Sequence, residues 1–257
     1  MSDLVLLEID ENLAVLTLNR AQRHNSLVPT LLEALLEKLE FIKARPDIRA
    51  VVLQAKGRSF STGGDLGGFA AHLDDIEAYA SELVGLLNQT ILGFIHLPQP
   101  IVGAVHGVVT GGSLGLVLAC DVVLLTPQAQ FTPYYSVVGF SPDGGWTALL
   151  PQIIGLKRAA EVLLRNQTIS AEQAVAWGLA SRIVPSQDIH VAARQAAEEI
   201  AAQIPGSVQY ARRLLSVNLV DLEGRLEAER SRFVELIARP ETQRSMLAFM
   251  EKMRKGS

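Results

Sequence analysis

The residues Ile101-Val-Gly-Ala-Val-His-Gly-Val-Val-Thr-Gly-Gly-Ser-Leu-Gly115 give the strongest indication of how this chain folds. The first five fit a short buried strand, and the glycines that follow permit a sharp turn into a helix. A second stretch repeats this arrangement, because a predicted strand at 50–54 precedes Phe60-Ser-Thr-Gly-Gly-Asp-Leu-Gly-Gly-Phe69. We therefore predict two glycine-rich turns, each between a strand and a helix.

Apolar patterns on both sides of these turns predict alternating strands and helices. Residues 4–18 fit two strands joined by a tight Asp-Glu-Asn turn, and apolar residues recur at helical spacing from Leu31 to Ile42. A further helix is expected near 76–96, and a strand at 121–125. This alternation predicts an α/β fold with largely parallel strand pairing.

From about Ser186 the pattern becomes helical throughout. Ala-rich and Leu-rich periods predict helices at residues 187–203, 206–220, 222–237 and 241–253. Pro205 and Pro240 punctuate these segments, because proline resists helical geometry. We therefore expect an α/β core at 1–185 that carries the functional site, and a helical region at 186–257 that serves oligomerisation.

The composition excludes several classes of protein. With 49% apolar and 19% charged residues among 257, the chain is expected to form one large domain or two modest ones and not to be disordered. The net charge is −4 and no basic block is interleaved with aromatic residues, so nucleic acid is not an expected partner. The single cysteine, Cys120, allows no internal disulfide, and no metal is expected because no His/Cys/Asp cluster has ligand spacing.

The sequence predicts neither a membrane span nor a signal peptide. The longest run without a formal charge, from Leu83 to Cys120, is interrupted by Pro98 and Pro100. The first residues include acidic side chains where a signal peptide would need a basic start. We expect a cytoplasmic protein that does not bind membranes.

The two glycine turns suggest where negative charge could be stabilised. Glycine lets a ligand approach backbone N–H groups, and the N-terminus of a helix leaves such donors unpaired beside a positive dipole end. Two such turns facing one pocket would form an oxyanion hole, although ordinary strand-to-helix turns also contain glycine. Neither turn matches the G-x-G-x-x-G or G-x-x-x-x-G-K-[ST] fingerprints of nucleotide sites.

One motif favours a different enzyme class. Gly111-Gly-Ser-Leu-Gly115 satisfies the G-x-S-x-G pattern of serine hydrolases. However, Ser113 lies eight positions after Val105, and the only downstream histidine is His190, at an expected exposed helix start. A serine hydrolase is therefore the weaker hypothesis.

Short motifs along nearly the whole chain resemble the enoyl-CoA hydratase/isomerase, or crotonase, superfamily. They are Leu18-Asn-Arg20, Asn25-Ser-Leu27, Phe60-Ser-Thr-Gly-Gly-Asp-Leu66, Pro100-Ile-Val-Gly-Ala-Val-His-Gly107, Gly111-Gly112, Ala119-Cys-Asp121, Gln130-Phe131, Pro142-Asp-Gly-Gly145, Ile169-Ser-Ala-Glu-Gln-Ala174 and Gly178-Leu179. Each is weak alone, but together they follow the order of the family. The resemblance implies a crotonase-like spiral of ββα units with a helical C-terminal region, assembled as a homotrimer or hexamer.

The resemblance also implies an acyl-CoA thioester substrate, with no cofactor beyond its CoA moiety. The backbone N–H groups of Gly64 and Gly112 would bind the thioester oxygen. The CoA moiety would contact Arg23, His24, Ser61, Gly63, Asp65, Leu66, Phe249 and Lys252, the last from its own or a neighbouring subunit.

Some of these residues also have ordinary structural interpretations. Asp65, beside Gly64, is expected to hold its loop as a helix cap or ion-pair partner, not to act as a catalytic acid. Arg23, His24 and Lys252 would equally be solvated surface residues.

The hydratase pattern of the family is incomplete here. Its two glutamates, which position and activate water, align with Gly115 and Tyr135. Asp143 lies where some family isomerases carry a catalytic aspartate and 4-chlorobenzoyl-CoA dehalogenases carry their nucleophile. It could instead cap a helix that begins near Trp146. Tyr135 and Trp146 are expected to line the acyl pocket.

We therefore interpret the chain as an acyl-CoA isomerase in which Asp143 moves a proton between carbons of an enoyl thioester. Further similarity over 163–177 and 238–249 is to 2-(1,2-epoxy-1,2-dihydrophenyl)acetyl-CoA isomerases, which implies fatty acid or aromatic acid metabolism. The alternatives are an enoyl-CoA hydratase, a dehalogenase-like enzyme and a non-catalytic acyl-CoA-binding protein.

Overall fold

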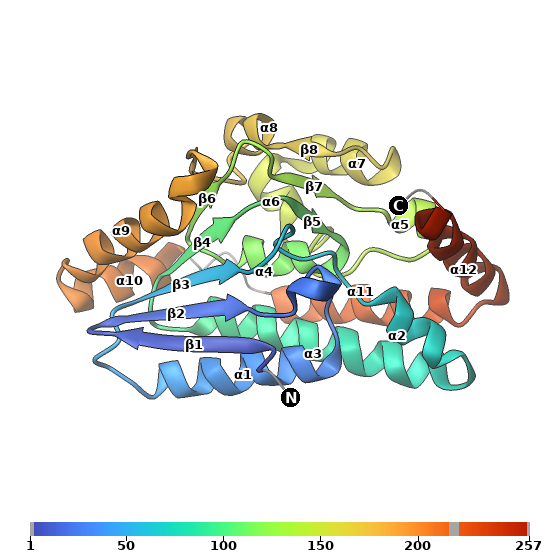
Figure 1. Ribbon diagram of the computed structural model, residues 1–257, viewed down its shortest axis with the longest axis horizontal. Coiled ribbons are helices and arrows are strands. Elements are labelled where there is room, and N and C mark those ends of the chain that lie inside the picture. Colours follow the sequence, from blue (N-terminus) through green and yellow to red (C-terminus); the bar gives the residue numbers. More distant parts are fainter. Residues whose placement is uncertain (1–2, 216–220, 256–257) are drawn as a thin grey trace.

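The computed structural model describes residues 3–215 and 221–255, which contain two β-sheets surrounded by helices (Figure 1). The main sheet has the strand order β1 (Val5–Asp10), β2 (Leu13–Leu18), β3 (Ala50–Ala55), β4 (Ile101–Val105), β6 (Val122–Leu125) and β9 (Arg182–Ile183). The second sheet has the order β5 (Val108–Thr110), β7 (Gln130–Thr132) and β8 (Ile169–Ser170). The predicted α/β architecture is confirmed.

Strand pairing in the main sheet brings the two glycine stretches to the same edge. β1 and β2 form an antiparallel hairpin, whereas β2, β3, β4, β6 and β9 pair in parallel. The carboxyl ends of parallel strands share one edge, and ligands of open α/β sheets bind outside that edge. The glycine stretches leave β3 and β4, so both begin at this edge.

Helices cover both faces of the main sheet. The α-helices of the described residues are α1 (Pro29–Lys43), α2 (Leu66–Ala71), α3 (Ile76–His96), α4 (Leu114–Leu118), α5 (Tyr135–Val138), α6 (Leu150–Ile154), α7 (Leu156–Leu164), α8 (Ala171–Ala176), α9 (Ile189–Ala201), α10 (Pro205–Leu215), α11 (Leu222–Ile237) and α12 (Pro240–Lys255). Alternate residues of β3 face opposite sides: Val51 and Leu53 join the core beneath α1 and α3, whereas Ala50 and Val52 pack with α9. Both faces are therefore buried, as expected for parallel strands.

The helical region is attached to the core at several points. α11 packs against α3, and α12 packs against α2 and α5. From α10, the buried Arg212 forms an ion pair with Asp121 (Nε to Oδ2, 2.7 Å) and donates to the carbonyls of Phe94 and Ile95 near the end of α3 (2.9 Å each). None of the helices in the described part of the chain has both the length and the apolar character of a bilayer span.

The structure differs from the sequence-based expectation mainly in its short elements. β5 intervenes between His106 and Gly111, so the second glycine turn does not directly follow β4. β5, β7 and β8 have two or three residues each, too few to show an alternating pattern. The predicted helix at 206–220 corresponds to α10, and its last five residues, 216–220, lie outside the described residues.

Candidate active site

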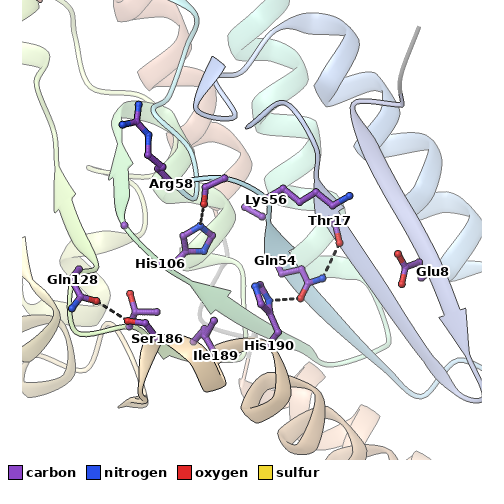
Figure 2. A pocket seen from close by; sticks show the side chains of 14 residues that line it. Glu8, Thr17, Gln54, Lys56, Arg58, His106, Gln128, Ser186, Ile189 and His190 are labelled. Atoms are coloured by element: carbon purple, nitrogen blue, oxygen red, sulfur yellow. Dashed lines mark hydrogen bonds between the residues drawn. The ribbon is translucent and has the colours of Figure 1, made fainter. Parts of the chain in front are cut away.

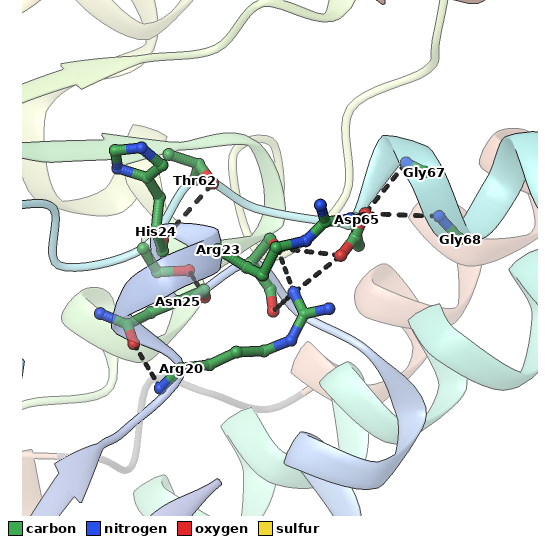
Figure 3. Close-up of polar contacts among 10 residues, drawn as sticks. Arg20, Arg23, His24, Asn25, Thr62, Asp65, Gly67 and Gly68 are labelled. Carbon is green, nitrogen blue, oxygen red and sulfur yellow. Dashed lines mark hydrogen bonds and ion pairs between the residues drawn. The ribbon is translucent and has the colours of Figure 1, made fainter.

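Asp65 lies at the centre of a polar network that joins two loops (Figure 3). It is 6% exposed and caps α2, because its Oδ1 accepts the N–H groups of Gly67 (2.9 Å) and Gly68 (3.3 Å). Its Oδ2 lies 2.7 Å from Nη1 of Arg20. Burial opposes ionisation of Asp65, but the hydrogen bond and charge of Arg20 hold its pKa below the usual value. Asp65 is therefore both a cap and an ion-pair partner, as expected.

Further contacts of this network bring the predicted CoA-binding loops together. Nη2 of Arg23 lies 3.7 Å from Oδ1 of Asp65, and the Arg23 side chain is 60% exposed. Ser61 donates to the backbone carbonyl of Asn25 (2.7 Å), and Nδ1 of His24 lies 3.1 Å from the Ser59 hydroxyl. The side chains of Arg23 and His24 lie on the same loop in Figure 3. A ligand lying along these loops would meet two basic or titratable side chains.

The backbone around Gly64 leaves one N–H group available. Leu27 pairs with this loop through its N–H to the Gly63 carbonyl (2.7 Å) and its carbonyl to the Asp65 N–H (2.9 Å). The N–H of Gly64 takes no part in this bridge, and no hydrogen bond from it occurs among the described residues. It is therefore a free donor beside a helix N-terminus.

The two glycine turns lie against each other. Gly63 has φ +73°, and a Cβ built on it would lie 2.6 Å from the Thr110 carbonyl oxygen, so neither the conformation nor the space suits a larger residue. Backbone hydrogen bonds also pair Ser61 with the strand at Val109. The predicted proximity of the turns is therefore present in the fold.

The serine of the G-x-S-x-G motif is fully buried within this contact. The Ser113 hydroxyl donates to the carbonyls of Ser61 (3.0 Å) and Thr110 (2.7 Å). His190 instead bonds to Oε1 of Gln54 through Nδ1 (2.7 Å). Ser113 therefore fastens the two turns together, and the arrangement does not support the hydrolase hypothesis.

Asp143 lies directly against the second glycine turn. A Cβ built on Gly112 would lie 3.0 Å from both carboxyl oxygens of Asp143. Gly144, at φ +63°, packs on the backbone of Gly112, where a Cβ would approach within 2.3 Å of the Gly112 carbonyl oxygen. Because Gly112 is the second residue of a helical segment that begins at Gly111, its N–H has no acceptor within that helix. A carboxyl group and an N–H donor that has no acceptor among the described residues thus occupy one small region.

The surroundings of Asp143 favour its protonated form. The side chain is 6% exposed, and Tyr135 donates to Oδ1 (2.5 Å). Burial raises the pKa of Asp143 to about 7, the hydrogen bond from Tyr135 opposes this rise, and the negative charge of Glu229 adds to it. Among the described residues, no Lys or Arg forms an ion pair with Asp143. The group can therefore gain or lose a proton near neutral pH.

A different carboxylate binds the turn that follows Asp143. Glu229, on α11, accepts the N–H groups of Gly145 (2.8 Å), Thr147 (2.7 Å) and Ala148 (2.9 Å) and the Thr147 hydroxyl (2.5 Å). The alternative interpretation of Asp143 as a helix cap is therefore wrong, because Glu229 satisfies these donors. The sequence does contain a signal for Glu229. It is 5% exposed and interrupts an otherwise apolar stripe formed by Leu222, Leu226, Phe233 and Ile237.

The two predicted pocket aromatics are buried and connect parts of the site. Nε1 of Trp146 donates to the Gly111 carbonyl (2.7 Å), so the indole ties the turn after Asp143 to the second glycine turn. Tyr135 packs edge-on against Trp146, with 6.2 Å between ring centroids. Both aromatics support the position of Asp143 relative to Gly112.

The two predicted C-terminal ligand residues lie on α12. The ring of Phe249 lies 5.8 Å from that of Tyr134, whereas Lys252 is exposed and forms no hydrogen bond or ion pair with any described residue. Among the described residues, neither forms a hydrogen bond or ion pair with the network around Asp65.

Two open cavities lie away from Asp143. One of about 560 Å³ opens at the carboxyl ends of β2, β3, β4 and β6 and is lined by Gln54, His106 and His190 among others (Figure 2). Another, of about 960 Å³, lies beside α3 and α11. Neither is lined by Gly64, Gly112 or Asp143.

Comparison with known proteins agrees with this arrangement. The family model described as enoyl-CoA hydratase/isomerase matches residues 8–256. The chain belongs to the enoyl-CoA hydratase/isomerase family. It is 31% identical over 243 residues to the 1,2-epoxyphenylacetyl-CoA isomerase of Escherichia coli, covering 90% of each chain. It is also 33% identical over 208 residues to a putative enoyl-CoA hydratase of Thermus thermophilus, covering 79% of this chain and 80% of the relative.

A solved structure supports the same assignment. The crystal structure of an enoyl-CoA hydratase from Bacillus halodurans matches with a TM-score of 0.89 and 26% identity, covering 95% of this chain and 99% of the other. The protein therefore has the crotonase-like fold of this family, and the names of its relatives include both hydratases and isomerases.

Gly115, the position at which the resemblance places one hydratase glutamate, has no room for a side chain. At Gly115, a built Cβ would lie 2.3 Å from Cδ1 of Ile91 and 2.6 Å from the Gly144 carbonyl oxygen. The turn after Asp143 thus occupies the space that a side chain would need. At the second glutamate position, Tyr135 directs its hydroxyl to Asp143. Gly115 and Tyr135 thus carry no carboxyl group, whereas the neighbouring Asp143 does.

Proposed function

We propose that this protein is an acyl-CoA isomerase that moves the double bond of an enoyl-CoA thioester. The observation that carries the proposal is Asp143, a buried carboxyl group with a pKa of about 7 that lies against the oxyanion-turn residue Gly112. General acid–base catalysis is most effective when the pKa of the catalytic group lies near the working pH. A single such group can remove a proton from one carbon and return it to another.

The reaction needs one base and stabilisation of an enolate. Ionised Asp143 takes a proton from the α-carbon of a 3-enoyl thioester, and the electron pair moves into the thioester carbonyl. The enolate oxygen accepts hydrogen bonds from the N–H groups of Gly64 and Gly112; loss of one such donor typically costs about 10²–10³ in rate. Protonated Asp143 then delivers the proton to the γ-carbon, which leaves the double bond between the α- and β-carbons.

The site supports isomerisation better than hydration or displacement. Hydration requires a group that activates water, and the two hydratase positions hold Gly115 and Tyr135. A carboxylate nucleophile must be ionised to attack, whereas burial keeps Asp143 partly protonated near neutral pH. Proton transfer uses both forms of the group.

We also propose that the CoA moiety lies along the loops that carry Arg23, His24 and Ser61, with Phe249 and Lys252 contributed by the same or a neighbouring subunit of a homotrimer or hexamer. Exposed apolar side chains in the helical region support such an assembly, among them Tyr210, Leu214 and Leu215 on α10. Light scattering coupled to size-exclusion chromatography measures the oligomeric state directly.

The proposed function is tested by incubating the protein with 3-enoyl-CoA and 2-enoyl-CoA thioesters in heavy water. We expect interconversion of the two isomers, with deuterium at the α- or γ-carbon and no water added to the product by mass spectrometry. Asp143→Asn should lower kcat by about 10²–10⁴, because it removes the proton carrier. A hydroxyacyl product, or binding of the thioesters without turnover, would contradict the proposal.

The exposed Asp74 provides the matched control. Asp74→Asn removes the same charge and should leave kcat unchanged. If Asp143→Asn binds substrate and retains full turnover, Asp143 is not the proton carrier.

A further inference from the structure

Glu229 is a buried carboxyl group that the proposed reaction does not use. It comes from α11, about 90 residues beyond Asp143 in the sequence, and lies in the helix face that packs against the core. A buried carboxylate without a cationic partner is costly unless hydrogen bonds compensate for the loss of water. Its retention in an otherwise apolar stripe therefore calls for a specific explanation.

The hydrogen bonds of Glu229 fix the backbone that carries Asp143. Oε1 accepts from Thr147 twice, through N–H and hydroxyl, and once from Ala148, whereas Oε2 accepts from Gly145. These four donors lie within residues 145–148, a segment that begins two residues after Asp143. Exposed Arg225, also on α11, donates to the Thr147 carbonyl (2.7 Å) and supports the same turn. The position of Asp143 therefore depends on α11.

The surroundings of Glu229 stabilise a negative charge better than those of the neighbouring Asp143. Glu229 accepts hydrogen bonds from four donors, whereas the Asp143 side chain accepts one, from Tyr135. Hydrogen bonds to an ionised carboxylate stabilise the ionised form, and two nearby carboxylates oppose each other's ionisation. Burial raises the pKa of Glu229 while its hydrogen bonds oppose that rise, and its charge raises the pKa of Asp143. Glu229 is thus expected to ionise before Asp143.

We propose that Glu229 is a positioning residue that holds the Asp143 turn against Gly112 and, through its own negative charge, keeps the proton of Asp143 available for transfer. The proposal rests on the proposed function for its catalytic meaning, but the effect of Glu229 on Asp143 is a property of the substrate-free protein. The titratable groups that face Asp143 in the described structure are Tyr135 from α5 and Glu229 from α11.

The test replaces Glu229 with a neutral residue of the same shape. Glu229→Gln should lower the midpoint of Asp143 titration by about one pH unit or more, because the opposing charge is gone. Infrared difference spectra of substrate-free protein, with and without Asp143→Asn, measure that midpoint directly. The midpoint of the pH dependence of kcat/KM should move by the same amount and in the same direction.

A matched control and a milder variant make the outcome decisive. Glu223→Gln removes an equal charge from an exposed position of α11 and should leave both midpoints unchanged. Thr147→Val removes one donor to Glu229 at an exposed site and should lower the Asp143 midpoint by a smaller amount, even if Glu229→Gln does not fold.

An unchanged Asp143 midpoint in folded Glu229→Gln and Thr147→Val would overturn the inference and leave Asp143 as the proton carrier. A shifted midpoint in a protein that shows no isomerase activity would instead overturn the proposed function while retaining the coupling of the two carboxyl groups.

Discussion

Two buried aspartates, each beside one of the glycine turns, have opposite environments. Asp65 follows Gly64 and caps α2. The hydrogen bond and charge of Arg20, together with the charge of Arg23, hold its pKa below the usual value. Asp143 lies against Gly112 and accepts a hydrogen bond from Tyr135. Burial and the negative charge of Glu229 raise its pKa to about 7. The same side chain, hardly exposed at either turn, is therefore an anion at one turn and a group that can gain or lose a proton near neutral pH at the other.

The difference teaches that a basic partner can outweigh the effect of burial on the ionisation of an aspartate. A cation within hydrogen-bonding distance stabilises the ionised form more than burial opposes it. Without that cation, the protein tolerates a buried acid at a cost in stability, and such perturbed groups concentrate at functional sites. Experiments that remove either acid should therefore have opposite consequences for stability.

The largest expected difference concerns Asp143 and pH. Between about pH 4 and 7 the folded protein keeps a proton on Asp143 that the unfolded chain has lost, so this group lowers the free energy of unfolding as pH rises, by about 4 kcal/mol in all. Asp143→Asn removes this pH-dependent contribution to the free energy of unfolding. Its stability relative to the original protein should therefore increase between pH 4 and pH 8, as measured by urea unfolding.

The exposed Asp74→Asn variant should show no such trend with pH. A stability difference for Asp143→Asn that is the same at pH 4 and pH 8 would mean that Asp143 titrates normally.

Removing Asp65 should destabilise the protein instead. Asp65→Asn leaves Arg20 partly buried without its counter-ion and weakens the cap of α2, which should cost about 3 kcal/mol at pH 7. Because the pKa of Asp65 is lowered by folding, its contribution is present above its unfolded pKa and is lost as pH falls through the lower folded pKa. Urea unfolding at pH 7 and pH 3 measures both effects.

The pH dependence of kcat/KM distinguishes Asp65 from Asp143. Folded Asp65→Asn should keep the same midpoint, because the titrating group is Asp143. A shifted midpoint would show that the two aspartates are coupled and that the comparison between them fails.

Most of the fold could be predicted from the sequence because its long elements carry strong periodicity. The hairpin at 4–18 and the helix at 76–96 lie within a residue or so of the observed elements. The second sheet was not predicted, because strands of two or three residues form through tertiary pairing alone.

The site could be predicted in part. The sequence itself indicates the two glycine turns, whereas the resemblance to the crotonase superfamily singles out Gly64, Gly112 and Asp143. The role of Glu229 depends on a contact across 81 to 84 residues, which no local pattern encodes. The hydrogen bond from Tyr135 to Asp143 likewise depends on how the backbone returns after α5. The sequence could not predict that Asp65 forms an ion pair with Arg20, whereas Asp143 has no ion-pair partner among the described residues.

Arg23→Gln is expected to have the smallest effect on stability. It also distinguishes a structural role of Arg23 beside Asp65 from a role in binding the CoA moiety. Its side chain is 60% exposed and its nitrogen lies 3.7 Å from Asp65, so Arg23→Gln should cost less than about 1 kcal/mol of stability. If Arg23 binds the CoA moiety, KM for the thioester should rise severalfold with kcat unchanged, because binding is weakened equally in the ground and transition states. The exposed Arg45, paired with Asp47, gives a matched control in which neither quantity changes. A loss of stability without a change in KM would assign Arg23 to the Asp65 network alone, and both basic partners of that aspartate would then be structural.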